Sequence, residues 1–257
     1  MKWLRFEHEG AVRYGTLDGD SVVVESGDPF GGSAPTGERL AVGEIRWLTP
    51  TEPRTMVALW NNFHALAAKN GWAIPAEPLY LLKSANSFAA HRDVVHALRG
   101  YDGRVTYEGE LAIVIGRTAH AVSVADAPAH ILGYTCANDV TALDIIGRDP
   151  GFAQWSRAKS FAGFGIFGPV IDTDFEPAGG ELVTLLNGRE RQRYRLADMI
   201  FAPATLVSRL SQDMTLQPGD VILCGTSLGV LPMKPGSRVD VVIEGIGTLT
   251  NTYEAAP

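Results

Sequence analysis

The stretch YEGELAIVIG at residues 107–116 places two carboxylates, Glu108 and Glu110, at alternate positions ahead of a continuous apolar run. An apolar run of this length, rich in Ile and Val, predicts a buried strand. Because side chains alternate between the two faces of a strand, Glu108 and Glu110 would point one way and the apolar residues 111, 113 and 115 the other. Two like charges buried side by side are unfavourable unless a cation or a shared proton compensates them. A divalent metal ion is the simplest compensating group, although a bare Glu-x-Glu pattern is more often the solvated face of an edge strand.

A third carboxylate, Asp139, ends the next apolar stretch, GYTCAND at residues 133–139. Three carboxylates without a nearby His or Cys form an oxygen-only ligand set, which suits Mg²⁺, Mn²⁺ or Ca²⁺ better than Zn²⁺. Such an ion keeps open coordination positions, from which a chelating 2-oxo acid displaces water. Spacing alone leaves a second interpretation open, in which Asp139 caps a helix-like run at residues 141–147.

Composition limits the class of protein. The chain has 257 residues, 46% of them hydrophobic, which is enough for one large domain or one domain with a small appendage. A net charge of −7 and a pI near 5.4 argue against nucleic-acid binding. No apolar stretch approaches the roughly 18 to 20 residues of a membrane span, and the charged N-terminus is unlike a secretory signal, so we expect a cytoplasmic protein. Cys136 and Cys224 lie in apolar runs and are expected to be buried free thiols.

Turn-forming residues divide the chain near residue 53. Residues 1–53 contain three short apolar runs separated by turns, which predicts a small N-terminal β-meander. From residue 26 this part is rich in Gly and Pro and predicts a linker crossed by one short strand at 45–48. We place the boundary of the second, larger domain, residues 54–257, after this linker.

Strands outnumber helices in the larger domain. Helices are expected at 63–70, 124–132 and 204–210, the first two ended by Gly71 and Gly133 and the third entered through Pro203. Strands are expected at 79–82, 111–115, 134–137, 169–172, 182–186, 221–224, 239–244 and 249–253. The fold class is therefore mainly β with short helices (α+β).

Several segments of the larger domain resemble, in order, the motifs of the fumarylacetoacetate hydrolase superfamily, and its isomerase and decarboxylase members in particular. Residues 107–116 resemble the family's Glu-x-Glu metal strand, 133–139 the segment of its third ligand, and Lys159-Ser160 the position of its active-site lysine. The later matches are Asn187-Gly188 with Gln192, Pro218 to Thr226, and Glu244 to Leu249 with Asn251.

The resemblance implies a fold and a chemistry. The fold is a twisted mixed β-sheet roll over residues 54–257, usually in a homodimer. The site is a Mg²⁺ or Mn²⁺ centre at Glu108, Glu110 and Asp139. The substrate is an enolisable 2-oxo acid.

The region after residue 60 departs from the family pattern. Hydrolases of the family carry Asn-Tyr-x-x-His-x-x-Glu in a flexible helical lid, whose His and Glu activate water. With Asn62 aligned to the family Asn, Leu66 takes the histidine position and Lys69 the glutamate position, while His64 lies on a different helical face. Because no register restores both residues, the dyad is incomplete. We still expect residues 61–73 to form a mobile lid.

A second departure concerns an arginine that several members carry four residues after the third metal ligand. Leu143 takes this position here, and Arg148 and Arg157 are the nearby substitutes. Spacing does not show which of them, if either, replaces it.

The candidate catalytic residues are Lys159 and His64. Lysines are usually surface residues, but the family position makes Lys159 a candidate to hold a substrate carboxylate or, if burial lowers its pKa, to donate a proton. His64 is kept because it lies close to Asn61 and Asn62. The candidate substrate-binding residues are Gln192, Thr226 and Lys83. By pattern alone, Gln192 lies in a charged stretch typical of a solvated hairpin, and Thr226 in an ordinary turn.

Three functions remain open at this point. The incomplete dyad favours isomerase or decarboxylase chemistry on a dicarboxylic 2-oxo acid of aromatic catabolism, because hydrolysis needs an additional activated water. Acylpyruvate hydrolysis is the second candidate. The third is a family member that has lost catalytic residues and binds a metal or a metabolite without turnover.

Overall fold

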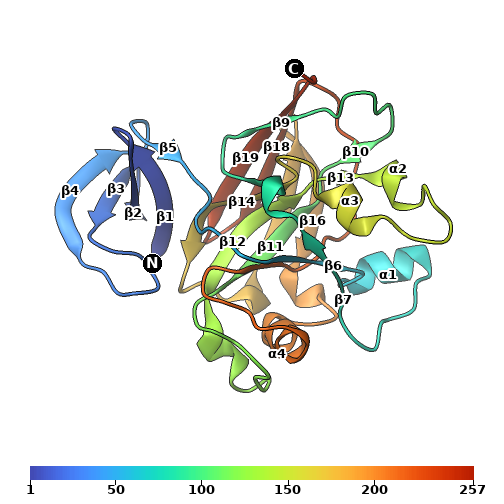
Figure 1. Cartoon of the computed structure of the whole chain (residues 1–257), viewed down its shortest axis with the longest axis horizontal. Coiled ribbons are helices and arrows are strands. Elements are labelled where there is room, and N and C mark those ends of the chain that lie inside the picture. The colour runs from blue at the N-terminus through green and yellow to red at the C-terminus, as the bar shows by residue number, and fades with distance from the viewer.

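The strand that carries the Glu-x-Glu motif lies inside the largest sheet of the protein. A computed structural model, which describes all residues 1–257, places β11 (Gly109–Ile115) between β12 (Ile131–Asp139) and β17 (Val221–Leu223) (Figure 1). Along the sheet the strands follow in the order β4 (Pro35–Ala41), β3 (Ser21–Glu25), β2 (Ala11–Asp18), β1 (Lys2–His8), β14 (Gly165–Asp172), β12, β11, β17, β6 (Met56–Trp60) and β7 (Leu79–Lys83). The short strands β5 (Arg46–Trp47) and β8 (Phe88–Ala89) pair with β1 and β14.

A second sheet packs against one face of the first. Its order is β16 (Arg189–Arg195), β15 (Glu181–Leu186), β18 (Ser237–Ile243), β19 (Gly247–Glu254) and β9 (Val94–His96), and β15, β18 and β19 contact β11, β12 or β14. The alternation predicted for β11 is confirmed: Leu111, Ile113 and Ile115 join the main core, whereas Ala112 and Val114 join a second, smaller cluster. Because β11 is buried on both faces, the solvated edge-strand interpretation is wrong.

Four short α-helices and one small ladder complete the fold. The helices are α1 (His64–Asn70), α2 (Leu143–Ile146), α3 (Trp155–Lys159) and α4 (Pro203–Asp213), and the ladder pairs β10 (Val105–Thr106) with β13 (Thr141–Ala142). The predicted end of α1 at Gly71 is confirmed, since Gly71 adopts φ 66° and its N–H bonds the carbonyl of Ala68. None of these helices is both long and apolar enough to cross a membrane.

Two predictions about elements are wrong, and β6 was not predicted. The expected helix at 124–132 is only a 3₁₀ turn (Ala127–His130), because Ile131 already pairs with Ile115 as the start of β12. The expected linker contains β4, a strand with almost entirely exposed side chains and hence no hydrophobic pattern. The strand β6 was not expected, because its continuous apolar sequence MVALW does not distinguish a buried strand from a helix.

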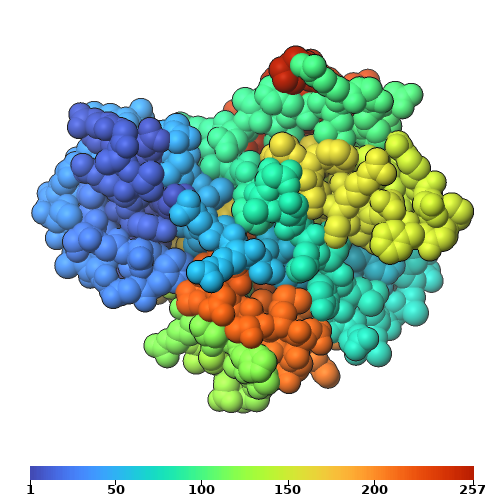
Figure 2. All heavy atoms as spheres, in the orientation of Figure 1, coloured from blue at the N-terminus to red at the C-terminus, as the bar shows by residue number.

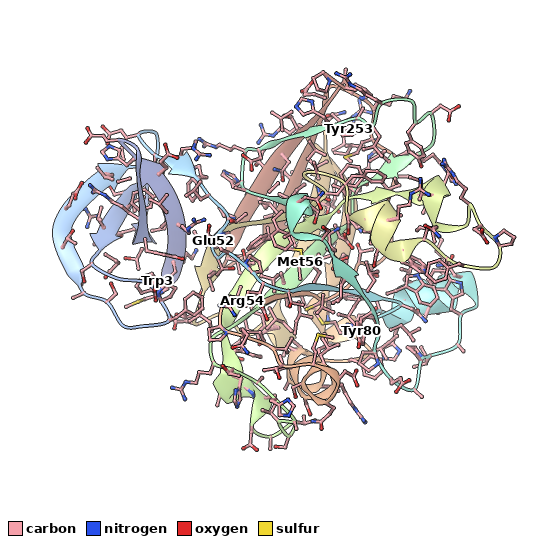
Figure 3. The ribbon with its side chains drawn as sticks, viewed as in Figure 1. Trp3, Glu52, Arg54, Met56, Tyr80 and Tyr253 are labelled. Atoms are coloured by element: carbon pink, nitrogen blue, oxygen red, sulfur yellow. The ribbon has the colours of Figure 1, made fainter.

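The N-terminal strands lie at one end of the large sheet. They form a separate mass on the left of Figures 1 and 2, and β1 joins β14 through the pairs Lys2 with Asp172 and Trp3 with Ile171. Figure 3 shows Glu52 and Arg54 in the segment that leads from these strands into β6. The carboxylate of Asp220 accepts hydrogen bonds from the N–H groups of Arg54 (3.0 Å) and Thr55 (2.8 Å) and fixes the start of β6 beside β17.

Candidate metal centre and active site

Pairing of β11 with β12 brings the three predicted carboxylates together. Gly109 faces Asn138 across the pair, and the N–H of Asp139 bonds the carbonyl of Glu108 at 2.9 Å. Glu108, Glu110 and Asp139 each offer an oxygen within 4.8 Å of the others. Glu110 and Asp139 are fully buried, and the side chain of Glu108 is 15% exposed. The helix-cap interpretation of Asp139 is wrong, because Ala142 precedes α2 and no side chain caps it.

The residue between the two glutamates has to be glycine. A Cβ at Gly109 would lie 2.0 Å from Thr184 Oγ1, far inside van der Waals contact. The backbone of Gly109 is also fully bonded: its N–H donates to Gln192 Oε1 (3.0 Å), and its carbonyl accepts from Tyr194 Oη (2.6 Å) and Thr226 Oγ1 (2.9 Å). This close approach of the second sheet fixes the directions of both neighbouring carboxylates.

The chemistry of these carboxylates fits a divalent cation. Glu110 Oε2 accepts the Gly225 N–H at 2.7 Å, but its buried Oε1 has no hydrogen-bond partner. Desolvation raises the pKa of Glu110 well above its usual value, and the neighbouring charges of Asp139 and Glu108 raise it further. A cation with oxygen ligands would satisfy the unpartnered oxygen and offset the clustered charge. Glu108, Glu110 and Asp139 are therefore the residues that would hold a divalent cation.

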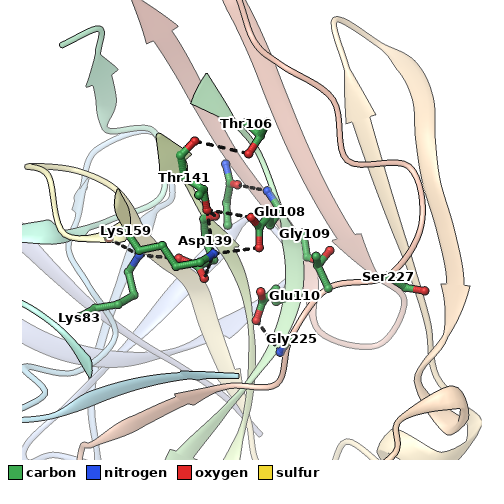
Figure 4. Close-up of polar contacts among 12 residues, drawn as sticks. Lys83, Thr106, Glu108, Gly109, Glu110, Asp139, Thr141, Lys159, Gly225 and Ser227 are labelled. Carbon is green, nitrogen blue, oxygen red and sulfur yellow. Dashed lines mark hydrogen bonds and ion pairs between the residues drawn. The ribbon is translucent and has the colours of Figure 1, made fainter. Parts of the chain in front are cut away.

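Two lysines converge on the same cluster from the other side (Figure 4). Lys159 Nζ lies 2.6 Å from Asp139 Oδ2, 3.0 Å from Glu108 Oε2 and 2.7 Å from Thr141 Oγ1. Lys83 Nζ lies 2.5 Å from Asp139 Oδ1 and also donates to the Lys159 carbonyl. Both lysine side chains are at most 4% exposed.

The surroundings shift the pKa values of the two lysines in opposite directions. Desolvation lowers the pKa of Lys83, and Asp139 compensates only in part. Desolvation acts on Lys159 too, but the three carboxylates outweigh it and raise the pKa of Lys159 above its usual value. The two ammonium groups likewise outweigh desolvation at Asp139 and lower its pKa. The three carboxylates therefore favour the charged form of Lys159.

A cavity of about 480 Å³ opens onto the cluster. Its polar lining residues are Asn61, Glu108, Lys159 and Thr226, and its other walls are almost entirely apolar. This volume lies in the range of about 300–1,000 Å³ that is typical of small-molecule sites. Glu108, together with Lys159, therefore forms the floor of a cavity large enough for a substrate, with Glu110 and Asp139 buried beside them.

The other residues predicted to bind substrate or act in catalysis differ in whether they line the cavity. Gln192 is 1% exposed and bonds Thr226 Oγ1 at 2.9 Å, so the solvated-hairpin interpretation is wrong for this residue. Thr226 lines the cavity, whereas Gln192 and Lys83 lie behind its surface. His64 is exposed and does not line the cavity, in contrast to Leu66, which does. Lys69 is exposed as well, and no His–Glu pair faces the carboxylates.

The position of the family arginine is likewise apolar in the structure. Leu143 lines the cavity, and neither Arg148 nor Arg157, both exposed, reaches it. No arginine therefore lines the cavity.

Three further residues shape the site and were not singled out from the sequence. Thr141 donates to Glu108 Oε1 at 2.8 Å, Tyr194 bonds the Gly109 carbonyl, and Gly225 holds Glu110. Gly225 adopts φ 88°, and this conformation aims its N–H at the carboxylate. The sequence CGTS at residues 224–227, directly after a buried strand, is the local pattern from which a role for Gly225 could have been predicted. Thr141 and Tyr194 contribute through contacts between strands that are distant in sequence, so no local pattern indicates them.

Comparison with known proteins agrees with this architecture. The family described as fumarylacetoacetate (FAA) hydrolase C-terminal matches residues 55–254, and one described as Rv2993c-like, N-terminal matches residues 1–50. Protein Rv2993c of Mycobacterium tuberculosis is 41% identical over 226 residues, which cover 87% of this chain and 84% of that protein. Oxaloacetate tautomerase YisK of Bacillus subtilis is 34% identical over 214 residues, with 79% and 70% covered. Among solved structures, 5-carboxymethyl-2-hydroxymuconate delta-isomerase of Mycobacterium smegmatis is similar over the whole of both chains, with TM-score 0.92 and 36% identity. The chain belongs to the fumarylacetoacetate hydrolase family.

Proposed function

We propose that the protein is a Mg²⁺- or Mn²⁺-dependent enzyme that interconverts the keto and enol forms of a 2-oxo acid, or moves a neighbouring double bond by the same proton transfer. The observation that carries this proposal is the cavity lining: Glu108 and Lys159 are its only ionisable side chains, and both belong to the carboxylate cluster. In this proposal Glu108 takes the proton from the carbon next to the 2-oxo group and returns it to the enolate oxygen, or the reverse, because the walls hold no other base. Decarboxylation would pass through the same enolate.

A divalent cation held by Glu108, Glu110 and Asp139 would supply positive charge next to the 2-oxo oxygen, where negative charge develops. The side chains of the protein do the remaining work. Lys159 is a cation at the floor and attracts the substrate carboxylate electrostatically while it stays bonded to Glu108 and Asp139. Thr226, held between Gln192 and the Gly109 carbonyl, lines the position beside it. The largely apolar walls lower the local polarity, which strengthens these electrostatic interactions.

Hydrolysis of a carbon–carbon bond is less well supported. It requires a water molecule activated by a base, and the structure has Leu66 where the family dyad would place its histidine. The names of two relatives, a tautomerase and a delta-isomerase, also favour proton-transfer chemistry. A protein that only binds a metal or a metabolite remains the alternative of another class.

The direct test is an assay of two substrates with Mg²⁺ and with a chelator. We expect the enol form of oxaloacetate to be converted to the keto form in a metal-dependent reaction, and acylpyruvates to be hydrolysed slowly or not at all. Faster hydrolysis of acylpyruvates would instead assign the protein to the hydrolases. Absence of both reactions in metal-loaded protein would favour the binding-only alternative.

Variants at two positions separate the roles of the candidate catalytic residues. Lys159→Met should lower kcat/KM on the order of 100-fold or more, because it removes the charge that orients and stabilises the reacting groups. His64→Ala is the matched control and should retain most of the activity, since His64 is exposed outside the cavity. Loss of activity in His64→Ala, with Lys159→Met active, would restore the hydrolase interpretation.

A further inference from the structure

Three of the five tryptophans in the chain meet at one place. The ring of Trp60, at the end of β6, lies 4.9 Å from that of Trp72, which follows α1, and 5.6 Å from that of Trp155, which begins α3. The ring planes of Trp60 and Trp72 are tilted by 45° to each other, and those of Trp60 and Trp155 by 51°. The segments that carry them lie side by side in Figures 1 and 2, where α1 is beside α2 and α3. We call these three residues the tryptophan wall.

The tryptophan wall lines the same cavity as the carboxylate cluster. Leu66, Leu143 and Ile146 continue its apolar surface, and Glu108 and Lys159 lie at the floor. All three tryptophans keep part of their surface exposed, and Trp72 is 38% exposed. An apolar surface left open beside a polar floor is suited to a ligand with one polar and one apolar end.

The charge distribution disfavours a second anionic group at this wall. Lys159 is the one cation that lines the cavity, and it is already engaged by Glu108 and Asp139. A carboxylate at the far end of a substrate would lose part of its hydration without gaining a cationic partner, which is unfavourable. A planar apolar group would instead gain contacts with the tilted indole rings.

We propose that the tryptophan wall is the specificity determinant of the enzyme and that the substrate is a 2-oxo acid with an aromatic or similarly planar apolar group at its far end. This inference rests on the proposed function. It replaces the dicarboxylic acid expected from the sequence with a monocarboxylic one. The 2-oxo acid end binds at the floor, and the apolar group lies against the wall.

The kinetic test compares the tautomerisation of phenylpyruvate and oxaloacetate by the Mg²⁺-loaded protein. We expect kcat/KM for phenylpyruvate to be about tenfold higher or more. Trp72→Ala should lower the value for phenylpyruvate about tenfold and change that for oxaloacetate little, since the far end of oxaloacetate does not use the wall. Leu143→Arg, which places a cation in the wall, should shift the preference towards oxaloacetate. The matched control is Ile74→Ala, because Ile74 is 52% exposed near Trp72 but does not line the cavity.

A binding measurement separates this inference from the proposed function. Phenylglyoxylate and glyoxylate are 2-oxo acids that cannot enolise, so calorimetry measures their affinity without turnover. We expect phenylglyoxylate to bind about tenfold more tightly than glyoxylate, and Trp72→Ala to abolish the difference. If this holds but neither substrate is turned over, the wall is confirmed and the tautomerase proposal fails. If oxaloacetate is turned over faster than phenylpyruvate and the two ligands bind equally, the inference about the wall is overturned while the tautomerase proposal stands.

Discussion

At the scale of single residues, the sequence identifies the chemical groups of the site but does not show which residues surround them. The Glu-x-Glu pattern predicted two carboxylates on one face, and the structure adds the third at Asp139 as expected. The burial of Gln192 and the pairing of Lys83 with Asp139 were not predictable, because both depend on partners from strands distant in sequence. The raised pKa of Lys159 has the same origin, since three carboxylates from two strands produce it.

Gly109 gives a residue-scale prediction. Gly109→Ala should lower the stability by about 1–3 kcal/mol, because its Cβ would overlap Thr184 Oγ1, and lower the melting temperature by about 2–4 °C for each kcal/mol. Thr184 Oγ1 has no hydrogen-bond partner, so Thr184→Ala should cost little and should partly restore the stability of Gly109→Ala. Gly43→Ala, where an added Cβ meets open space, is the control. Equal melting temperatures for Gly109→Ala and Gly43→Ala would show that the second sheet does not restrain this strand.

At the scale of elements, most apolar strands of the larger domain were predictable, with β6 as an exception, whereas elements defined by pairing were not. The expected strand at 111–115 and the helix entered through Pro203 are present, and both extend beyond their predicted limits. The exposed strand β4 and the 3₁₀ turn before β12 depend on neighbouring strands, which leave no local signal.

The segment from Asn61 to Ala73, which contains α1, remains our predicted lid. Asn61 Nδ2 bonds the Ala73 carbonyl at 3.1 Å and joins the two ends of the segment, and the helix between them has only seven residues. A ligand in the cavity would contact Leu66 and Trp72 and restrict this segment. We therefore expect slower hydrogen exchange in residues 61–73 when Mg²⁺ and oxalate are added, with α4 as an unaffected reference. Equal protection with and without oxalate would contradict the lid.

At the scale of the whole molecule, the large sheet continues from the N-terminal strands to β7. The division at residue 53 stays a prediction about folding units, since β1 pairs with β14 of the larger part. At the opposite end, β7 pairs only with β6, so its other edge is free. Tyr80 and Leu82, which alternate with buried residues of β7, are 39% and 48% exposed. An apolar surface on an edge strand is typical of a contact between copies of a chain.

We propose that the protein forms a homodimer to which this surface contributes. Sedimentation velocity should show a dimer for the wild-type protein, and Leu82→Lys should shift the equilibrium towards monomer by placing a charge in the apolar contact. Val12→Lys is the control, because Val12 is also an exposed apolar residue on a strand but lies in the N-terminal part. A dimer unchanged by Leu82→Lys would place the contact elsewhere on the molecule.

The central claim is that Glu108, Glu110 and Asp139 form one divalent-cation site, and a calorimetric titration of the metal-free protein with Mn²⁺ tests it most directly. Wild-type protein should bind one ion per chain, and Glu110→Gln should lose most of this affinity, because it removes the charge of the buried carboxylate whose Oε1 has no other partner. Glu77→Gln, at an exposed glutamate outside the cluster, should bind as the wild type does. Unchanged Mn²⁺ affinity in Glu110→Gln would contradict the claim and with it the enzyme proposed here.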